Sequence, residues 1–438
     1  MYARKGAFPN WVGEISIYEG DASHRSIKKH SSLRLPDETI YYGFLVYREI
    51  SQLILVLPHQ IQIIPFENHA WNQEKKSVFE LQGLTMPWAK STAVPFQPLL
   101  ENQQASQVWI PTIQGYQTFY MNEKSITKGE FISLYPKSFY RSSYDLLPFE
   151  MSYWFQNIYW YPKIYAGSLD GKNEILFSPW MDEIDIVAKK DQNKLTSHYF
   201  KILSEKERDD GVHYLINEPI DLNNDGRTDF LINKFQGTGT SFRSKSVYYL
   251  TDEKGKIPAK GKTVPMPKKK IAGALVRDIT KNGKQDFVMV SSLMNVWSMI
   301  RALTKKQVLL SFDMYLFKDD QTDYDFDHPD VTREILFDFS LQDFFIDGIL
   351  PTLEGDYNGD GYPDVMYATN PRELTFLIQK PKDKDLFDAV PSGLYQVDIP
   401  KKYRVGDCTG DGKSDLVFFS TRANENDQFK VLINKGML

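Results

Sequence analysis

One nine-residue pattern constrains this chain more than any other feature of its sequence. In one-letter code it reads D-x-N/T-x-D-G-x-x-D, and a short apolar run follows it each time. Three full copies occur in the second half of the 438 residues: DLNNDGRTDFLI from Asp221, DYNGDGYPDVMY from Asp356 and DCTGDGKSDLVF from Asp407. Self-similarity of this kind indicates a repeat architecture, so repeats have to be counted before domains.

Weaker copies extend the repeat towards the N-terminus. DITKNGKQDFVMV begins at Asp278, and GSLDGKNEILF keeps Asp170, Gly171 and Glu174 of the pattern. Further upstream, two strand-like runs without acidic residues each reach a proline and then, eight residues later, an aromatic residue. Taking the residue before each apolar run as a marker, we count seven units of about 50 to 78 residues, marked by Gln52, Gln107, Glu174, Asp229, Asp286, Asp364 and Asp415.

The units predict an all-β fold. Each consists of short β-runs such as FLIN, SVYYL and VLIN, separated by turn residues and not by long helices. A four-stranded antiparallel sheet needs about sixty residues, and a radial arrangement of such sheets leaves few exposed strand edges. We therefore predict one domain, residues 1–438, folded as a seven-bladed β-propeller. The run GEISIY near the N-terminus lies outside the seven units and is expected to complete the last blade.

One unit carries an insertion near residues 293–330. The segment LMNVWSMIRALTKK predicts a short amphipathic helix, because apolar residues fall at helical spacing: Leu293, Val296, Trp297, Ile300 and Leu303. We expect this helix to pack on its own propeller, the alternative being a neighbour's groove. An acidic run, KDDQTDYDFDHPD, follows with Asp323, Asp325 and Asp327 at alternate positions, and we interpret it as a solvated loop and not as a further metal site.

The repeated loop has the chemistry of a calcium site. Oxygen-bearing side chains stand at positions 1, 3, 5 and 9, and the glycine at position 6 permits the sharp turn that brings them together. The first site would use Asp221, Asn223, Asp225 and Asp229 with the carbonyl of Arg227. Its equivalents are Asp356, Asn358, Asp360 and Asp364 with the carbonyl of Tyr362, and Asp407, Thr409, Asp411 and Asp415 with that of Lys413.

Two other interpretations of the loop were weighed. An EF-hand needs a glutamate at position 12 and a following helix, but Ile232, Tyr367 and Phe418 stand there, inside β-runs. Asp, Asn and Gly also favour turns without metal, although clustered carboxylates without a cation would repel one another. We expect calcium in the three full loops. The fourth loop has one carboxylate fewer, so its binding is left open: Asp278, Thr280, Asn282 and Asp286.

These loops resemble those of the FG-GAP/VCBS repeats, the calcium-bearing propeller blades of integrin α-subunit heads and of many exported bacterial proteins. The resemblance implies a propeller, structural calcium and an extracytoplasmic setting, in the periplasm or at the cell surface. The same setting follows from calcium affinity, because loops that bind calcium only modestly are filled where free calcium is near millimolar, which is outside the cytoplasm. Residues 1–10 lack the apolar run of a signal peptide, so an exported protein would have this chain as its mature form. No apolar stretch is long enough to span a membrane.

Net charge and missing motifs argue against nucleic-acid binding and against the common linear catalytic motifs. A net charge of -5 is of the wrong sign for a nucleic-acid binder. There is no H-E-x-x-H or G-x-S-x-G motif, and nothing marks a nucleophile. We therefore predict a non-enzymatic, calcium-stabilised scaffold for protein partners in a periplasmic or cell-surface assembly. A glycan-binding propeller and a polysaccharide-cleaving enzyme are the alternatives. The aromatic run YWFQNIYWYPKIY, ending at Tyr165, could stack on sugars or fill space between blades.

Overall fold

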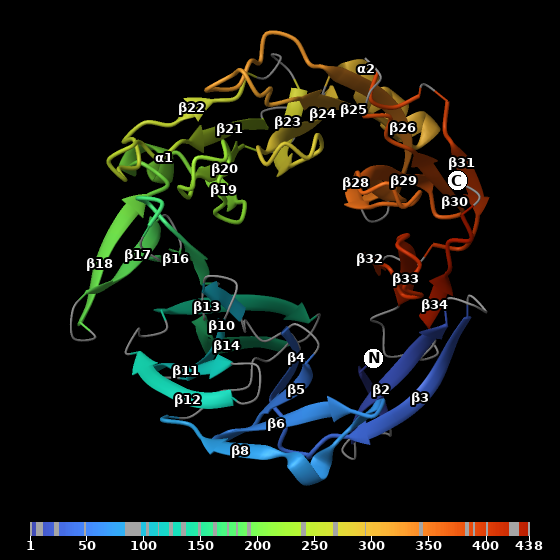
Figure 1. The fold of residues 1–438 in the computed structure, drawn as a ribbon. Coiled ribbons are helices and arrows are strands. Elements are labelled where there is room, and N and C mark those ends of the chain that lie inside the picture. Colours follow the sequence, from blue (N-terminus) through green and yellow to red (C-terminus); the bar gives the residue numbers. More distant parts are fainter. Residues whose placement is uncertain are drawn as a thin grey trace. The chain divides into compact units, whose positions relative to one another are not determined.

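The computed structural model describes most of the chain, and strands make up most of what it describes (Figure 1). Contacts divide the chain into two compact units, residues 1–18, 29–167 and 174–202 in unit 1, and 19–28, 168–173 and 203–438 in unit 2. The described residues are 2–5, 12–21, 26–47, 50–83, 98–101, 105–112, 114–121, 126–132, 137–147, 150–160, 164–172, 175–180, 183–190, 194–237, 242–265, 270–293, 295–340, 345–381, 385–388, 390–399, 402–419 and 429–436.

Seven of the sheets correspond to the seven predicted units. In each, the second strand along the chain contains its marker residue, begins at it, or begins directly after it. These strands are β5 (Ile50–Val56), β10 (Ala105–Thr112), β16 (Ile175–Trp180), β20 (Phe230–Gln236), β24 (Asp286–Leu293), β29 (Asp364–Asn370) and β33 (Asp415–Phe419). The fold class is thus the predicted seven-bladed β-propeller, and each of these sheets is called a blade below.

Unit 1 holds three blades, built from antiparallel neighbours. The first combines β5 with β4 (Tyr41–Tyr47), β6 (Gln60–Glu67), β7 (Ala70–Trp71) and β8 (Ser77–Glu80), with a 3-10 turn at Gln73–Lys75. The second combines β10 with β9 (Pro98–Glu101), β11 (Gly115–Met121) and β12 (Ile126–Ile132). The third combines β16 with β15 (Tyr165–Gly167), β17 (Glu183–Lys190) and β18 (Lys194–Lys201).

Two small sheets lie outside this scheme. A long hairpin joins β13 (Lys137–Leu147) to β14 (Glu150–Trp160). The predicted strand GEISIY is part of β2 (Val12–Asp21), which pairs with β1 (Tyr2–Lys5) and β3 (Ser26–Arg34). It pairs with these strands and not with the last blade, so the expectation that it completes that blade was wrong.

Unit 2 holds four blades. The fourth blade combines β20 with β19 (His213–Ile216), β21 (Arg243–Tyr249) and β22 (Lys262–Thr263), after helix α1 (Glu205–Asp209). The fifth combines β24 with β23 (Lys270–Arg277), β25 (Gln307–Tyr315), β26 (Val331–Ser340) and β27 (Phe345–Ile346). The sixth combines β29 with β28 (Ile349–Gly355), β30 (Glu373–Leu377) and β31 (Gly393–Gln396), and the seventh combines β33 with β32 (Lys402–Gly406) and β34 (Phe429–Leu432).

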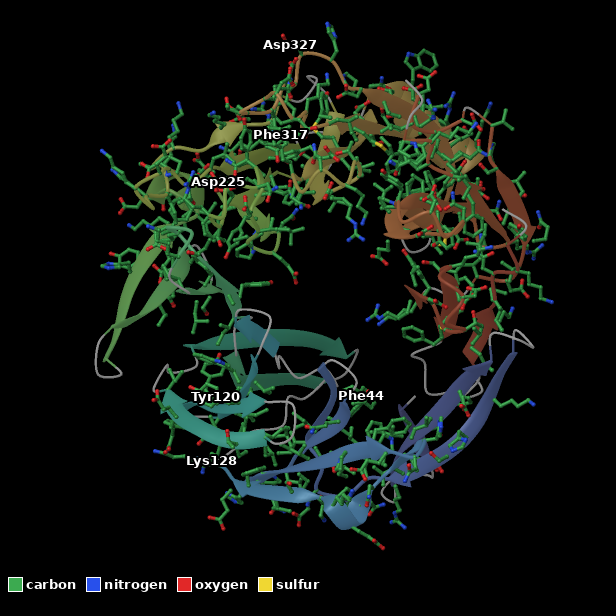
Figure 2. The ribbon with its side chains drawn as sticks, viewed as in Figure 1. Phe44, Tyr120, Lys128, Asp225, Phe317 and Asp327 are labelled. Atoms are coloured by element: carbon green, nitrogen blue, oxygen red, sulfur yellow. The ribbon has the colours of Figure 1, made fainter. Side chains whose placement is uncertain are left out.

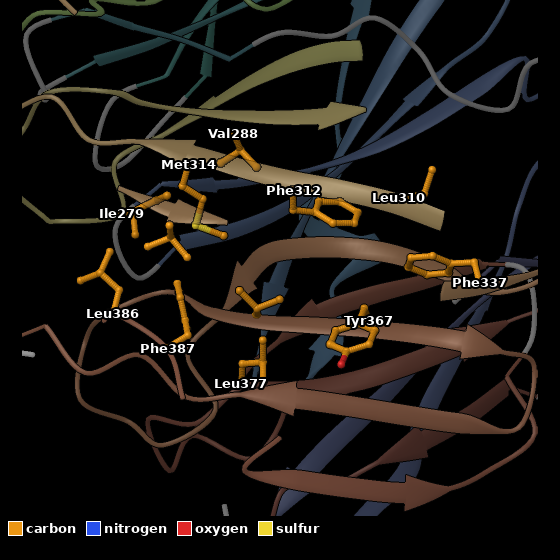
Figure 3. Packing of buried hydrophobic residues seen from close by; sticks show 12 residues of the cluster. Ile279, Val288, Leu310, Phe312, Met314, Phe337, Tyr367, Leu377, Leu386 and Phe387 are labelled. Atoms are coloured by element: carbon orange, nitrogen blue, oxygen red, sulfur yellow. The ribbon is translucent and has the colours of Figure 1, made fainter. Parts of the chain in front are cut away.

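The cores lie between neighbouring blades. Strand β25 is buried on both faces from Leu310 onwards, and its apolar side chains Leu310, Phe312 and Met314 share one of them. They join a buried cluster that includes Phe337 of β26 and Tyr367 of β29, so this cluster bridges the fifth and sixth blades (Figure 3). Within unit 1, an equivalent cluster joins the first two blades. Apolar packing between sheets therefore holds successive repeats together.

The insertion in the fifth blade contains the predicted helix. Helix α2 (Val296–Lys305) forms where the sequence predicts it and packs on β25, as expected for a helix that packs on its own propeller. None of its side chains is buried, however, and its apolar side chains are exposed.

The acidic run is not simply a solvated loop. Tyr324 is buried and Phe326 packs beside it against Phe287, while Asp325 and Asp327 are exposed. Asp327 marks this loop in Figure 2. Alternate residues therefore face in and out, and the aromatic ones fill space between the fourth and fifth blades.

Candidate metal-binding loops

The repeated loop has one conformation in four blades, where it joins the first strand to the second. The glycine at position 6 has a left-handed backbone each time, with φ between 81° and 88°: Gly226, Gly283, Gly361 and Gly412. Position 4 also has positive φ in each loop. A side chain at position 6 would strain the turn, so the glycine has the role that the sequence assigns to it.

The carboxylate at position 1 organises the turn. Asp221 accepts hydrogen bonds from the backbone N–H groups of Asp225, at 3.1 Å, and Gly226, at 2.6 Å. Asp225, labelled in Figure 2, then accepts one from the N–H of Arg227 at 2.9 Å. The same pattern recurs from Asp278, Asp356 and Asp407.

Position 3 differs among the loops. Asn223 donates from Nδ2 to Asp225 at 2.8 Å, but its buried Oδ1 has no hydrogen-bond partner among the described residues. Asn358 makes the same bond to Asp360, and its Oδ1 accepts the N–H of that residue at 3.0 Å. Thr409, in the last loop, is buried. The first loop therefore contains a buried oxygen that lacks a donor, which is costly unless something else satisfies it.

The aspartate at position 9 has a role that the sequence analysis missed. Asp229 is fully buried, and its two oxygens accept the N–H of Leu222, at 2.9 Å, and of Thr251, at 2.7 Å. Thr251 lies two residues after the third strand of the blade ends. The other three blades repeat both bonds, from Asp286 to Ile279 and Phe317, from Asp364 to Tyr357 and Gln379, and from Asp415 to Cys408 and Asn434. This carboxylate therefore links the start of the loop, by hydrogen bonds, to the segment that follows the third strand of the same blade.

Burial and like charge both act on this aspartate. Burial is the main cause that raises the pKa of Asp229 to about 7. The two N–H bonds lower this pKa, whereas the charges of Asp225 and Asp221 raise it further. Burial likewise raises the pKa of Asp286 and of Asp364 to about 6. The carboxylates of a loop are therefore close enough to repel one another, and a bound cation would relieve that repulsion.

Basic side chains at position 7 already supply some positive charge. Arg227 forms an ion pair with Asp225 at 2.5 Å. The Lys284 ammonium instead donates to the backbone carbonyls of Lys318, Asp319 and Gln321. Tyr362 occupies this position in the loop that begins at Asp356. That loop has no basic residue of its own and keeps both Asp356 and Asp360 without an internal countercharge.

The donor set fits calcium at four of the five predicted positions. The side-chain oxygens at positions 1, 3 and 5 and the carbonyl at position 7 are hard ligands. Position 9 already accepts two N–H groups, and it could reach a metal only through its remaining lone pairs. Within the described ranges, no three carboxylate, imidazole or thiol groups are gathered as a metal cluster. The aspartate at position 9 is therefore buried and bonded to backbone N–H groups, whereas the carboxylates at positions 1 and 5 are at least partly exposed.

Two other features of the sequence are located only in part. Of the shortened copy, Glu174 lies outside the described residues, but Ser168 exchanges hydrogen bonds with Thr228 of the next loop. In the aromatic run, the aromatic side chains before Tyr165 lie outside the described residues, so its sugar-stacking interpretation is untested. No described helix is long and apolar enough to cross a membrane.

Comparison with known proteins shows similarity of fold. No family model matches the sequence, and no curated protein matches it significantly. Among solved structures, a periplasmic gluconolactonase of Pseudomonas aeruginosa covers 96% of this chain and 95% of its own, at 10% identity and a TM-score of 0.37. A Bacteroides fragilis protein assigned as a 6-phosphogluconolactonase covers 90% and 95%, at 11% identity and 0.33. The WD40 domain of SCAP from fission yeast covers 90% and 81%, at 8% identity and 0.32.

These names correct the predicted function. The sequence analysis inferred a non-enzymatic scaffold from the lack of a linear catalytic motif, whereas two of the three structures above bear the names of lactonases. The prediction of a non-enzymatic scaffold was therefore wrong in treating the lack of a linear motif as evidence against catalysis. The likeness concerns the fold alone, and the named activities belong to those proteins.

Proposed function

We propose that this chain is a calcium-binding β-propeller protein, with one Ca²⁺ in each loop that begins at Asp221, Asp356 or Asp407. The observation that carries the proposal is the buried Oδ1 of Asn223, which has no donor among the described residues and belongs to a side chain that bonds to Asp225. A buried acceptor without a donor costs about 1–3 kcal/mol. A cation ligated by this oxygen removes that cost.

Bound calcium would relieve the repulsion between the carboxylates of each loop. Burial is the main cause of the raised pKa of Asp229, and the charges of Asp225 and Asp221 raise this pKa further, so the ionised loop is under electrostatic repulsion. A divalent cation bound at positions 1, 3, 5 and 7 neutralises two carboxylates and leaves position 9 on its backbone partners. The loop from Asp278 has Asn282 in place of the second of these carboxylates, so we place it last in affinity.

The proposal extends to family and setting. The loop pattern supports membership of the FG-GAP/VCBS repeats, and the four recurring loop conformations support it further. Sites built from short surface loops bind calcium with modest affinity, and such sites fill where calcium is near millimolar. We therefore place the working site of this protein outside the cytoplasm, in the periplasm or at the cell surface.

Calorimetric titration tests the proposal. Protein stripped with EGTA and dialysed is titrated with CaCl₂, and separately with MgCl₂ as the competing hard cation. We expect three calcium equivalents for the natural chain and two for Asp360→Asn, because the latter removes the carboxylate at position 5 of its loop. Asp252→Asn, which changes an aspartate outside the loops, is the matched control and should retain three. Absence of calcium heat together with an unchanged melting curve would refute the proposal.

A further inference from the structure

Helix α2 presents its apolar side chains to solvent. Val296, Ile300 and Leu303 follow the spacing of one helix face, and Trp297 and Met299 flank them. Their exposures are large: 78% for Trp297, 70% for Val296 and 58% for Leu303. A soluble helix normally buries such a face. Here the helix leaves it without cover among the described residues.

The opposite side of the helix faces its own blade. Ser298 and Ala302, four residues apart, are the residues of α2 that are half-buried, and the helix packs on β25. Asn295 and Ser298 form a reciprocal capping box at the first turn. Caps and small residues thus hold the helix in place, and the apolar face takes no part in holding it. This explains why that face can point away from the sheet.

Positively charged residues lie on the polar side of the helix and at its C-terminal end. Helix α2 contains no acidic residue, and Arg301, Lys305 and Lys306 are exposed and form no ion pair within the described part of the chain. One exposed acidic residue, Asp338, pairs with Gln307 just after the helix and lowers the net charge there. Apolar contact should therefore contribute more than charge to whatever binds.

We propose that α2 binds the surface of an anionic lipid bilayer, lying flat with Trp297, Ile300 and Leu303 among the lipid acyl chains. A helix with one apolar face, a tryptophan and flanking cations has the features of an interfacial helix. Unpaired lysine and arginine side chains complement anionic headgroups, each contributing about 1 kcal/mol near such a surface. At ten residues the helix is about 15 Å long, too short to span a bilayer but long enough to rest on one.

Vesicle co-sedimentation tests this proposal independently of the calcium sites. The full chain, in 1 mM CaCl₂ throughout, is mixed with vesicles of phosphatidylcholine and phosphatidylglycerol at 7:3, and with vesicles of phosphatidylcholine alone. We expect binding to the anionic vesicles that Trp297→Ala weakens by at least about fivefold, since an inserted indole ring buries a large apolar area. Leu215→Ala changes a similarly exposed apolar residue on β19 and should bind normally.

A second pair of variants tests the contribution of charge to vesicle binding. Arg301→Glu should weaken binding to the anionic vesicles more than to the neutral ones, whereas Lys260→Glu, at an exposed site elsewhere, should not. Melting curves of all variants should match that of the natural chain, because none of these side chains is buried. If the natural chain stays in solution with anionic vesicles, or Trp297→Ala sediments equally, the proposal is wrong. A dimer seen in ultracentrifugation that Trp297→Ala abolishes, without vesicle binding, would assign the face to a second copy instead.

Discussion

The carboxylate of Asp229 accepts a hydrogen bond of 2.7 Å from the backbone N–H of Thr251, at the end of the third strand of its blade. Its other oxygen holds the N–H of Leu222, at the start of the loop. One buried side chain thus fixes two backbone segments that lie on either side of the second strand. The weaker copy makes the same two bonds from Asp286, although asparagine replaces aspartate at its position 5. The aspartate at position 9 therefore has a structural role in all four blades.

Asp229→Asn should destabilise the protein with or without calcium. The amide keeps one oxygen and turns an N–H₂ group towards a backbone N–H, so a buried donor loses its charged acceptor at a cost of about 2–4 kcal/mol. Asp360→Asn, exposed at position 5 of a loop that has no basic residue, should cost little in EGTA and lower the stability only when calcium is present. Urea unfolding of both variants in each buffer measures this. Equal losses in EGTA would show that position 9 has no separate structural role.

Calcium should raise the melting temperature of the natural chain. With a dissociation constant of order 0.1 mM and 1 mM calcium, each filled site adds about 1.4 kcal/mol to the free energy of unfolding, and three sites add about 4 kcal/mol. Asp360→Ala and Asp411→Ala should each remove about one third of the calcium-dependent shift. Asp278→Ala should remove less, because its loop lacks one carboxylate. Scanning calorimetry in calcium and in EGTA measures the calcium-dependent shift in melting temperature of each variant. If Asp278→Ala loses the largest part of this shift, the ranking by number of carboxylates is wrong.

Sequence predicts the repeat well because each marker residue lies in a second strand or directly before it, and the apolar pattern of these strands is strong. Asp286, Asp364 and Asp415 each stand at the start of a second strand, and Gly226 has the left-handed backbone that its position requires. The partner of Asp229 could not be read in the same way. Thr251 lies twenty-two residues further on, and nothing in its own neighbourhood identifies it. Pairing across two strands is set by the assembled sheet.

The insertion shows the same limit. The sequence identifies an amphipathic helix at Trp297 but not the side on which the sheet lies, which depends on how the hairpin between β24 and β25 places it. In the acidic run, the alternation of aspartate with Tyr324 and Phe326 is the period of a half-buried strand. That signal was present in the sequence, but the high charge of the segment favoured the solvated interpretation.

Tyr324→Ala should be strongly destabilising, although the residue lies in an acidic loop. Its ring is buried against Phe287 and Phe317, and its hydroxyl donates to the carbonyl of Gln285 at 2.8 Å. Loss of the ring leaves a cavity between two blades and costs about 3–5 kcal/mol. Asp325→Ala, the exposed neighbour, should change the stability by less than about 0.5 kcal/mol. Urea midpoints compare them, and a small effect from Tyr324→Ala would restore the solvated-loop interpretation.

Glu207 should make the stability of unit 2 depend on acid pH. Partial burial raises its pKa, but hydrogen bonds from Lys245, Lys234 and the backbone of Ser204 outweigh burial and hold the pKa at about 2. Because the folded pKa lies below the unfolded value, this carboxylate stabilises the fold at pH values above the unfolded pKa. The contribution is lost as pH falls from about 4.5 towards 2.

Glu207→Gln removes that contribution and leaves the buried Lys234 ammonium without its countercharge. The variant should therefore be less stable than the natural chain by about 1–3 kcal/mol at pH 7, since the pair is only partly buried. This difference should shrink steadily as pH falls from 4.5 to 2.5. Urea unfolding at pH 7, 4.5, 3.5 and 2.5 measures it, and Glu205→Gln, an exposed neighbour on α1, serves as the control. A difference that stays constant down to pH 2.5 would mean that the ion pair does not set the pKa of Glu207.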